Sequence, residues 1–232
     1  MRVLVTAGPT REYIDTVRFI TNASTGRMGY AVAEAAGRAG HDVTLLSGPV
    51  SRELVASAKK LKCKVVPFIS VADLKAALEE PFDACDALVM AAAVGDFRPN
   101  KAFPGKLRRA DGPIVVSLFP TEDILAGVGT RKREGQTIVA FAVEVGTHEQ
   151  VEAKARREMK AKNADYVVVN TPAAMAAEES SACILSPTGL VMPWGVRPKE
   201  ALAEEIVRLL SSGWRPGRVP SPTGGKGAAG NA

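Results

Sequence analysis

One short segment carries the residue types that bind anions. It reads Asn22-Ala23-Ser24-Thr25-Gly26-Arg27-Met28-Gly29 and leads into a stretch typical of a helix. Small residues there expose backbone N–H groups, and the positive end of a helix attracts phosphate. The alternative is that Ser24 or Thr25 caps the helix while the glycines serve packing. The segment therefore indicates either a phosphate-binding turn or an ordinary helix start.

The segment after the first apolar run does not have the dinucleotide pattern. Thr6-Ala7-Gly8-Pro9-Thr10-Arg11-Glu12 holds one glycine, whereas a tight pyrophosphate turn uses G-x-G-x-x-G. It is either part of a binding site or a simple strand-to-loop turn. The residues that follow it, 15–22, are expected to form a long irregular connection, which is more often functional than filler.

Two further loops have functional compositions. Met90-Ala91-Ala92-Ala93-Val94-Gly95-Asp96-Phe97-Arg98-Pro99 places small residues at a strand end, where a flat ligand or a ribose can approach the backbone. Asp96 would accept hydrogen bonds from hydroxyls or help to hold a metal; alternatively it pairs with Arg98 or caps the turn. Pro104-Gly105-Lys106-Leu107-Arg108-Arg109 is a basic loop that would close over a triphosphate, or is simply a solvated charge run.

The elements that must position these loops alternate between strand and helix. Strands are expected at 2–6, 42–46, 63–67, 86–92, 114–118, 138–141 and 166–169, and helices at 28–39, 52–61, 70–80, 122–128, 148–162 and 198–210. A hairpin is expected at 182–193. Continuous apolar strands between helices predict a Rossmann-like, three-layer α/β fold: a mostly parallel sheet, helices on both faces and a C-terminal β-hairpin. Ligands of such sheets bind at the carboxyl ends of the strands, where these loops lie.

Charge placement argues against a nucleic-acid partner. The 232 residues carry a formal net charge of +5. Three positive charges, Arg215, Arg218 and Lys226, fall in a Gly/Pro/Ser-rich segment, 211–232, that is expected to be a disordered tail. The rest of the chain is left with +2, and it lacks the interleaved aromatic and basic residues of a stacking platform.

Composition excludes several other classes. With 46% hydrophobic residues the chain is not disordered as a whole. Its three cysteines form no C-x-x-C pair, and its two histidines are far apart in sequence, so neither a disulfide framework nor a local zinc site is predicted. No run approaches the roughly 18 apolar residues of a membrane helix. We expect a cytoplasmic protein with no membrane partner.

From the residues alone, the chain is predicted to be a nucleotide-binding α/β protein, a transferase or a ligase. Over residues 1–210 it also resembles the phosphopantothenate–cysteine ligase family of coenzyme A biosynthesis, the synthetase half of a bifunctional flavoprotein. The resemblance rests on the segments already quoted and on 18–29, 47–50, 120–125, 139–144 and 162–170. The flavin-dependent half is absent, so a stand-alone synthetase or an excised domain is expected, with no flavin.

The resemblance implies a two-step reaction. The carboxylate of 4′-phosphopantothenate attacks a nucleoside triphosphate, CTP in the typical bacterial enzymes, and the amine of cysteine then displaces CMP. It implies Mg²⁺ or Mn²⁺ with the nucleotide, although the metal ligands are not assigned, and a homodimer. Base recognition through backbone groups leaves CTP and ATP undistinguished.

The resemblance also assigns residues. Asn22 would hold the acyl-cytidylate carbonyl as a catalytic residue, and Lys106 matches an essential lysine. The nucleotide-binding positions are Ser24, Gly26, Met28, Met90, Ala91, Ala92, Asp96, Lys106, Pro120, Thr121, Asp123, Ile124, Phe141 and Lys162. Phe141 would otherwise simply pack in the core. Glu158 stands where the family often has a second lysine, which puts one phosphate or base contact in question.

Two other classes remain as alternatives. A flavin- or NAD(P)-binding oxidoreductase on a similar fold is opposed by the missing G-x-G-x-x-G, and bound flavin absorbance would support it. A nucleic-acid binder would show steeply salt-dependent affinity, which the small charge of the body opposes.

Overall fold

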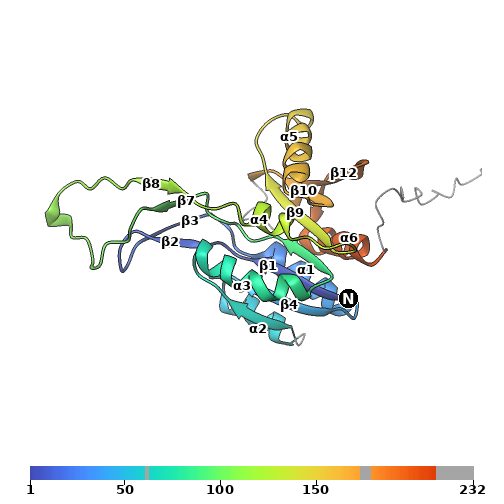
Figure 1. Ribbon diagram of the computed structural model, residues 1–232, viewed down its shortest axis with the longest axis horizontal. Helices are drawn as coiled ribbons and strands as arrows, with labels where there is room; N and C mark the ends of the chain where they lie inside the picture. The colour runs from blue at the N-terminus through green and yellow to red at the C-terminus, as the bar shows by residue number, and fades with distance from the viewer. Residues whose placement is uncertain (61–62, 173–178, 213–232) are drawn as a thin grey trace, which may run out of the picture.

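The fold is built on one eight-stranded sheet (Figure 1). The computed structural model describes residues 1–60, 63–172 and 179–212. The strand order is β12-β11-β10-β9-β6-β1-β4-β5, and the run from β10 to β5 is parallel throughout. The strands are β1 (Arg2–Ala7), β4 (Asp42–Ser47), β5 (Lys64–Pro67), β6 (Ala87–Met90), β9 (Thr137–Val143), β10 (Tyr166–Asn170), β11 (Glu179–Ser186) and β12 (Gly189–Pro198).

Alternating side chains of the strands feed two cores, one on each face of the sheet. Val3, Val5 and Ala7 of β1 belong to the core under α1 (Arg27–Arg38), α2 (Arg52–Lys60) and α6 (Lys199–Ser211), whereas Leu4 belongs to the other. That second core lies under α3 (Val71–Ala84), α4 (Ile124–Thr130) and α5 (His148–Ala161). This period-two division follows from the pleat of a strand covered on both sides. It confirms the three-layer, mostly parallel fold with a C-terminal hairpin, β11 and β12.

Side-chain caps fix where the helices of the second face begin. Ser70 and Thr147 form capping boxes with Asp73 and Gln150 at α3 and α5, and Asp123 accepts from the Ala126 N–H at the start of α4. Such caps satisfy backbone donors that the first turn leaves unpaired. α3 continues past the expected end at residue 80 to Ala84, with Pro81 inside it.

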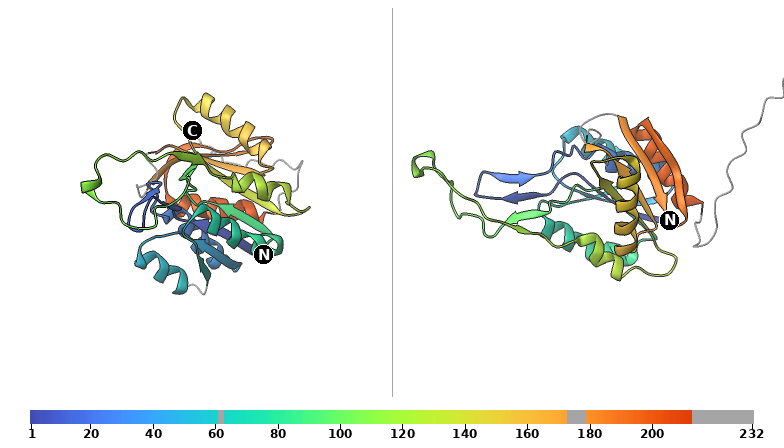
Figure 2. Two further views of the ribbon diagram at one scale, coloured as in Figure 1. Left: turned by 60° about the vertical axis from the view of Figure 1, so that its left-hand side comes forward. Right: turned by 90° about the horizontal axis from the view of Figure 1, so that it is seen from above.

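A second substructure projects from the sheet (Figures 1 and 2). It consists of the hairpin β2 (Arg11–Tyr13) and β3 (Phe19–Thr21), the pair β7 (Phe97–Pro99) and β8 (Leu118–Pro120), and the loop 100–117 between them. We call these segments, 11–21 and 97–120, the arm. The Phe103 N–H donates to the Ile14 carbonyl oxygen at 2.9 Å, so the two halves of the arm lie side by side.

The arm corrects two expectations. No strand of the main sheet occupies 114–118: within the part of the chain that the structure describes, only Leu118 is in a strand, β8, and that strand pairs with β7 in a separate sheet. Ile114 and Val115 are 47% and 92% exposed, so these apolar side chains lie at the surface and not in a core. The connection expected to be irregular instead contains the β2–β3 hairpin.

The end of the chain is described only to Ser212. α6 ends at Ser211, one residue into the expected tail, and 213–232 lie outside the described residues, as do 61–62 and 173–178. Across the described ranges, none of the helices has the length and apolar character needed to cross a bilayer.

Candidate functional site

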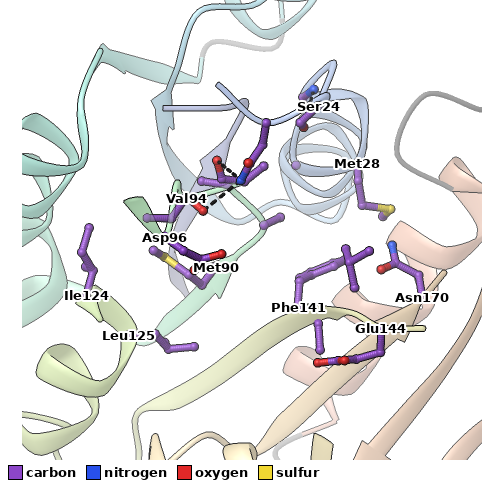
Figure 3. Close-up of a pocket in the computed structure, with 18 of the residues that line it drawn as sticks. Ser24, Met28, Met90, Val94, Asp96, Ile124, Leu125, Phe141, Glu144 and Asn170 are labelled. Atoms are coloured by element: carbon purple, nitrogen blue, oxygen red, sulfur yellow. Dashed lines mark hydrogen bonds between the residues drawn. The ribbon is translucent and has the colours of Figure 1, made fainter. Parts of the chain in front are cut away.

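A pocket of about 650 Å³ opens at the carboxyl ends of the central parallel strands (Figure 3). Its walls come from the α1 approach, the ends of β6, β9 and β10, the start of α4, one side of α5 and the first residue of α6. Parallel strands bring their carboxyl ends to one edge, so loops distant in sequence meet there. The pocket is lined by 13 predicted site residues: Asn22, Ser24, Gly26, Met28, Met90, Ala91, Ala92, Asp96, Thr121, Asp123, Ile124, Phe141 and Lys162.

Asn22 is held in place by backbone carbonyls. Its Nδ2 donates to the carbonyl oxygens of Val94 at 3.0 Å and Ala93 at 3.4 Å (Figure 3). These bonds tie the loop before α1 to the loop after β6. The carboxamide thus sits between the two predicted binding segments, and one of these bonds must open before Nδ2 can donate to a ligand.

The α1 start is an uncapped turn rather than a side-chain cap. The N-cap is Gly26 in a left-handed conformation, φ 79°, and no side-chain cap bond to α1 is present among the described residues. Ser24 Oγ instead accepts from the Gly26 N–H at 3.3 Å. The capping alternative for Ser24 and Thr25 is therefore wrong. Gly29 serves packing, because a Cβ there would lie 2.5 Å from the Ala7 Cβ.

The floor of the pocket is fixed by hydrogen bonds between strand ends. Thr6 Oγ1 accepts from the Ala92 N–H at 3.0 Å and donates to Met90 Sδ at 3.4 Å. Thr121 is placed by its N–H, which donates to the Asp96 carbonyl oxygen at 2.9 Å. Phe141 packs partly against the core and also lines the pocket.

Alternating charges run along the α5 wall. Lys154 Nζ lies 2.8 Å from a Glu144 oxygen and 3.9 Å from Glu158 Oε1, and Lys162 Nζ lies 3.4 Å from Glu158 Oε2 and 3.3 Å from Asp123 Oδ2. The hydrogen bond that the Lys154 ammonium donates to the Glu144 carboxylate raises the pKa of Lys154. Glu158 therefore bridges two lysines, and carboxylates offset both of these cations.

Lys106 and Pro120 do not line the pocket. Pro120 ends β8 in the arm, and Lys106 lies in the 100–117 loop. The neighbour of Lys106 is anchored: Leu107 N–H donates to Asp15 Oδ2 at 3.1 Å, and Arg18 Nη2 donates to the Leu107 carbonyl oxygen at 3.1 Å. In this conformation the basic loop is thus part of the arm and does not close over its own chain's pocket.

Sequence reasoning missed several pocket residues. Glu144, Lys154 and Asn170 stand in segments that the resemblance covers, but the residues alone gave them no role. Lys199 also lines the pocket. One sequence signal was present for it, because a lysine at the first position of a helix opposes the helix dipole.

The described residues show neither a cluster of metal-binding side chains nor an activated thiol. No group of three or more His, Cys, Asp or Glu side chains that could hold a metal is found there. Burial raises the pKa of all three thiols, that of Cys183 to about 12. None of them is a thiolate nucleophile near neutral pH.

The fold and the pocket define a Rossmann-like α/β domain with a polar site at the carboxyl edge of its sheet. Residues 1–213 match the family described as the DNA/pantothenate metabolism flavoprotein C-terminal domain, and the chain belongs to that family.

Curated relatives differ in name. The chain is 45% identical over 168 residues to the coenzyme A biosynthesis bifunctional protein CoaBC of Bacillus subtilis, covering 72% of this chain and 39% of the relative. It is 38% identical over 213 residues to a cysteine/cysteine sulfinic acid decarboxylase of an unknown prokaryotic organism, covering 90% of this chain and 57% of the relative. The chain thus spans about two fifths to three fifths of these proteins.

Solved structures share the fold. The crystal structure of the C-terminal domain of coenzyme A biosynthesis bifunctional protein CoaBC has a TM-score of 0.70 at 31% identity, covering 91% of this chain and 94% of that one. A Cab2 mutant in complex with phosphopantothenate-cysteine has a TM-score of 0.72 at 20% identity, covering 91% of this chain and 87% of that one. At that identity the second likeness concerns the fold alone.

Proposed function

We propose that this chain is a phosphopantothenate–cysteine ligase that acts in coenzyme A biosynthesis through an acyl-nucleotidylate, with CTP as the nucleotide. The observation that carries the proposal is that one pocket gathers Asn22, Asp96, Phe141 and Lys162 from four separated segments. The family, and the CoaBC domain that matches along nearly its whole length, support it.

The first step joins two anions, so the site must offset their repulsion. A carboxylate oxygen of phosphopantothenate attacks the α-phosphorus of CTP, the bond to the bridging oxygen breaks, and pyrophosphate leaves. Arg27, Lys162 and Lys199 are among the cationic side chains that line the pocket, and the N–H groups at the α1 start are its dipolar groups. Ser24, Gly26 and Met28 would face the phosphates, and Met90 to Ala92 with Ile124 would enclose the base.

A divalent ion in this pocket would be held mainly by the phosphates of the nucleotide, with few protein ligands. Asp96 and Asp123 are the carboxylates near the predicted nucleotide positions, and no three-ligand group exists in the described chain. Mg²⁺ characteristically keeps several waters and binds through one or two carboxylates and substrate phosphates. We assign Asp96 as the protein contact of such an ion, because Asp123 already caps α4 and pairs with Lys162.

In the second step the amine of cysteine attacks the acyl carbon, the bond between the carbonyl carbon and the phosphate oxygen breaks, and CMP leaves with that oxygen. The amine loses a proton as the amide forms. Asn22 would donate an N–H of Nδ2 to the developing oxyanion, exchanging one of its bonds to Ala93 or Val94 for this contact.

We also propose that two copies pair through the arm, so that Lys106 of one copy serves the pocket of the other. The arm exposes apolar side chains that a monomer rarely gathers, with Val17 at 55%, Phe97 at 51% and Val115 at 92% exposed. This pairing would give Lys106, which lies outside its own pocket, a triphosphate to contact.

Product formation tests the function. Purified protein is incubated with CTP, Mg²⁺, phosphopantothenate and cysteine, and the mixture is analysed by mass spectrometry. We expect phosphopantothenoylcysteine only when every substrate is present. Absence of that product, or flavin absorbance with turnover of NAD(P)H, would overturn the proposal in favour of the oxidoreductase alternative.

A further inference from the structure

The first residue of α6 is a buried lysine in the pocket wall. Lys199 is 5% exposed and, like Arg27, Met28 and Asn170, lines the pocket. Among the described residues no carboxylate lies within ion-pair distance of its ammonium, and no hydrogen bond from it is found. A largely buried lysine whose ammonium lacks a protein partner is costly unless water or a ligand in the pocket solvates the charge.

A second polar atom of the pocket lining also lacks a partner. Asn170 is 8% exposed, and its Oδ1 has no hydrogen bond within the described ranges. Figure 3 shows its carboxamide turned into the pocket between Met28 and Phe141. β10 ends at Asn170, and β12, which runs in the same direction two strands away, ends just before Lys199. The two residues therefore share the carboxyl edge of the sheet.

Two helices start side by side at this place. The first residues of both helices, Arg27 and Lys199, line the pocket, and at the far end His41, just after α1, bonds to Ser211, the last residue of α6, so the two packed helices run in the same direction. In the part of the chain that is described, neither N-cap, Gly26 or Pro198, makes a side-chain cap bond, unlike those of α3, α4 and α5. Both positive helix ends thus meet the pocket without an acidic cap.

The local charges reinforce one another. Burial, followed by the proximity of the Arg27 guanidinium, lowers the pKa of Lys199, while the adjacent Glu200 acts in the opposite direction. An anion bound between the helix starts would relieve both the burial of the ammonium and its repulsion from Arg27.

We propose that Lys199, with the paired starts of α1 and α6, forms a phosphoryl-binding subsite at this end of the pocket. This inference rests on the proposed function for the identity of its ligand, which is a phosphoryl group of the nucleotide triphosphate or the phosphate monoester of the acid substrate. In either case Lys199 binds substrate and is distinct from the α5 wall lysines, which carboxylates already offset.

Direct binding tests the subsite without requiring turnover. Inorganic pyrophosphate, CTP and phosphopantothenate are titrated calorimetrically into the parent protein, Lys199→Met and Lys199→Gln. Lys160→Met, an exposed lysine of α5 outside the pocket, is the control for loss of one charge. We expect both Lys199 variants to lose at least about tenfold in affinity for a phosphorylated ligand, and the control to change less than about twofold.

The pattern of loss identifies the phosphoryl group. Weaker binding of pyrophosphate and CTP assigns the triphosphate, and weaker binding of phosphopantothenate alone assigns the monoester. We expect Lys199→Met to melt no lower than the parent, because a buried charge is removed. If all three ligands bind both variants as tightly as the parent, the subsite proposal is wrong; a protein that binds these ligands but forms no amide would instead refute the proposed function.

Discussion

At the scale of single residues, the carboxamide of Asn22 links two loops that the chemistry needs together. Its Nδ2 donates to the carbonyl oxygens of Val94 and Ala93. The same donor group is the one proposed to meet the oxyanion, so the residue has both a positioning and a reacting role.

Asn22→Asp separates these roles. We expect pyrophosphate release to continue, while amide formation falls by about 100-fold, the typical effect of losing one oxyanion donor. Pyrophosphate and phosphopantothenoylcysteine are measured in the same mixture, and melting temperature is the folding control. Equal loss in both steps would contradict the assignment.

Asp15 is the residue that holds the basic loop to the β2–β3 hairpin. Its side chain is buried and accepts from the N–H groups of Val17, Arg18 and Leu107. Burial alone would raise the pKa of Asp15, but the N–H groups of Arg18, Val17 and Leu107 and the Arg18 guanidinium outweigh it and lower the pKa.

Asp15→Asn is therefore predicted to loosen the loop and to raise KM for the nucleotide.

A carboxyl group whose pKa is lowered by folding stabilises the fold above its unfolded pKa of about 3.9, and this contribution is lost as pH falls through the folded pKa. Urea unfolding at stepped pH should show the parent losing stability below that value more steeply than Asp15→Asn. Parallel pH curves for the two proteins would contradict the role.

At the scale of elements, the pocket depends on how closely α1 approaches β1. A Cβ on Gly29 would lie 2.7 Å from the Thr6 carbonyl oxygen and 2.5 Å from the Ala7 Cβ, and both residues are fully buried in β1. Gly37 is in the same helix, and its nearest neighbour to such a Cβ is Cys63 Sγ at 4.0 Å.

This difference gives a matched pair. Gly29→Ala should lower the free energy of unfolding by about 1–3 kcal/mol or more, through overpacking. Gly37→Ala should raise it by about 0.5–1 kcal/mol, because alanine is the better helix former. Denaturant unfolding measures both, and a Gly29→Ala protein as stable as the parent would show that α1 does not need this approach.

How far the sequence predicts these elements depends on where their partners lie. Strands between helices, such as β1 and β9, were predicted because burial on both faces leaves a continuous apolar run. The run at 114–118 has the same composition, but it belongs to the arm, whose apolar side chains are exposed. Composition does not distinguish a buried strand from an exposed apolar segment of the arm.

The site shows the same limit. Asp96 was predicted because it follows a strand whose carboxyl end must converge with those of its neighbours, whereas Asn22 and Lys162 were assigned by the family resemblance. The position of Lys106 depends on how the arm folds, and the role of Glu158 depends on Lys154, one helical turn away. Such relations between elements are not encoded in local patterns.

At the scale of the whole molecule, we predict that the pocket of each copy is completed by Lys106 from the arm of a second copy. Asn22→Asp and Lys106→Ala are each expected to be nearly inactive in amide formation. When the two variants are mixed in equal amounts and exchange subunits, half of the dimers should contain one copy of each variant. Each such dimer holds one intact site of two, so about one quarter of the parent activity should be recovered. Sedimentation measures the dimer directly. No recovery in a mixture that does contain mixed dimers would place Lys106 in its own chain's site.

The central claim is that the carboxylate of the acid substrate is activated as an acyl-nucleotidylate. Phosphopantothenate labelled with heavy oxygen in both carboxylate positions tests it most directly, with CTP and cysteine as co-substrates and mass spectrometry of the products. The mechanism predicts that one labelled oxygen leaves with CMP and the other remains in the new amide. Unlabelled CMP, or label found in pyrophosphate or inorganic phosphate, would contradict the account.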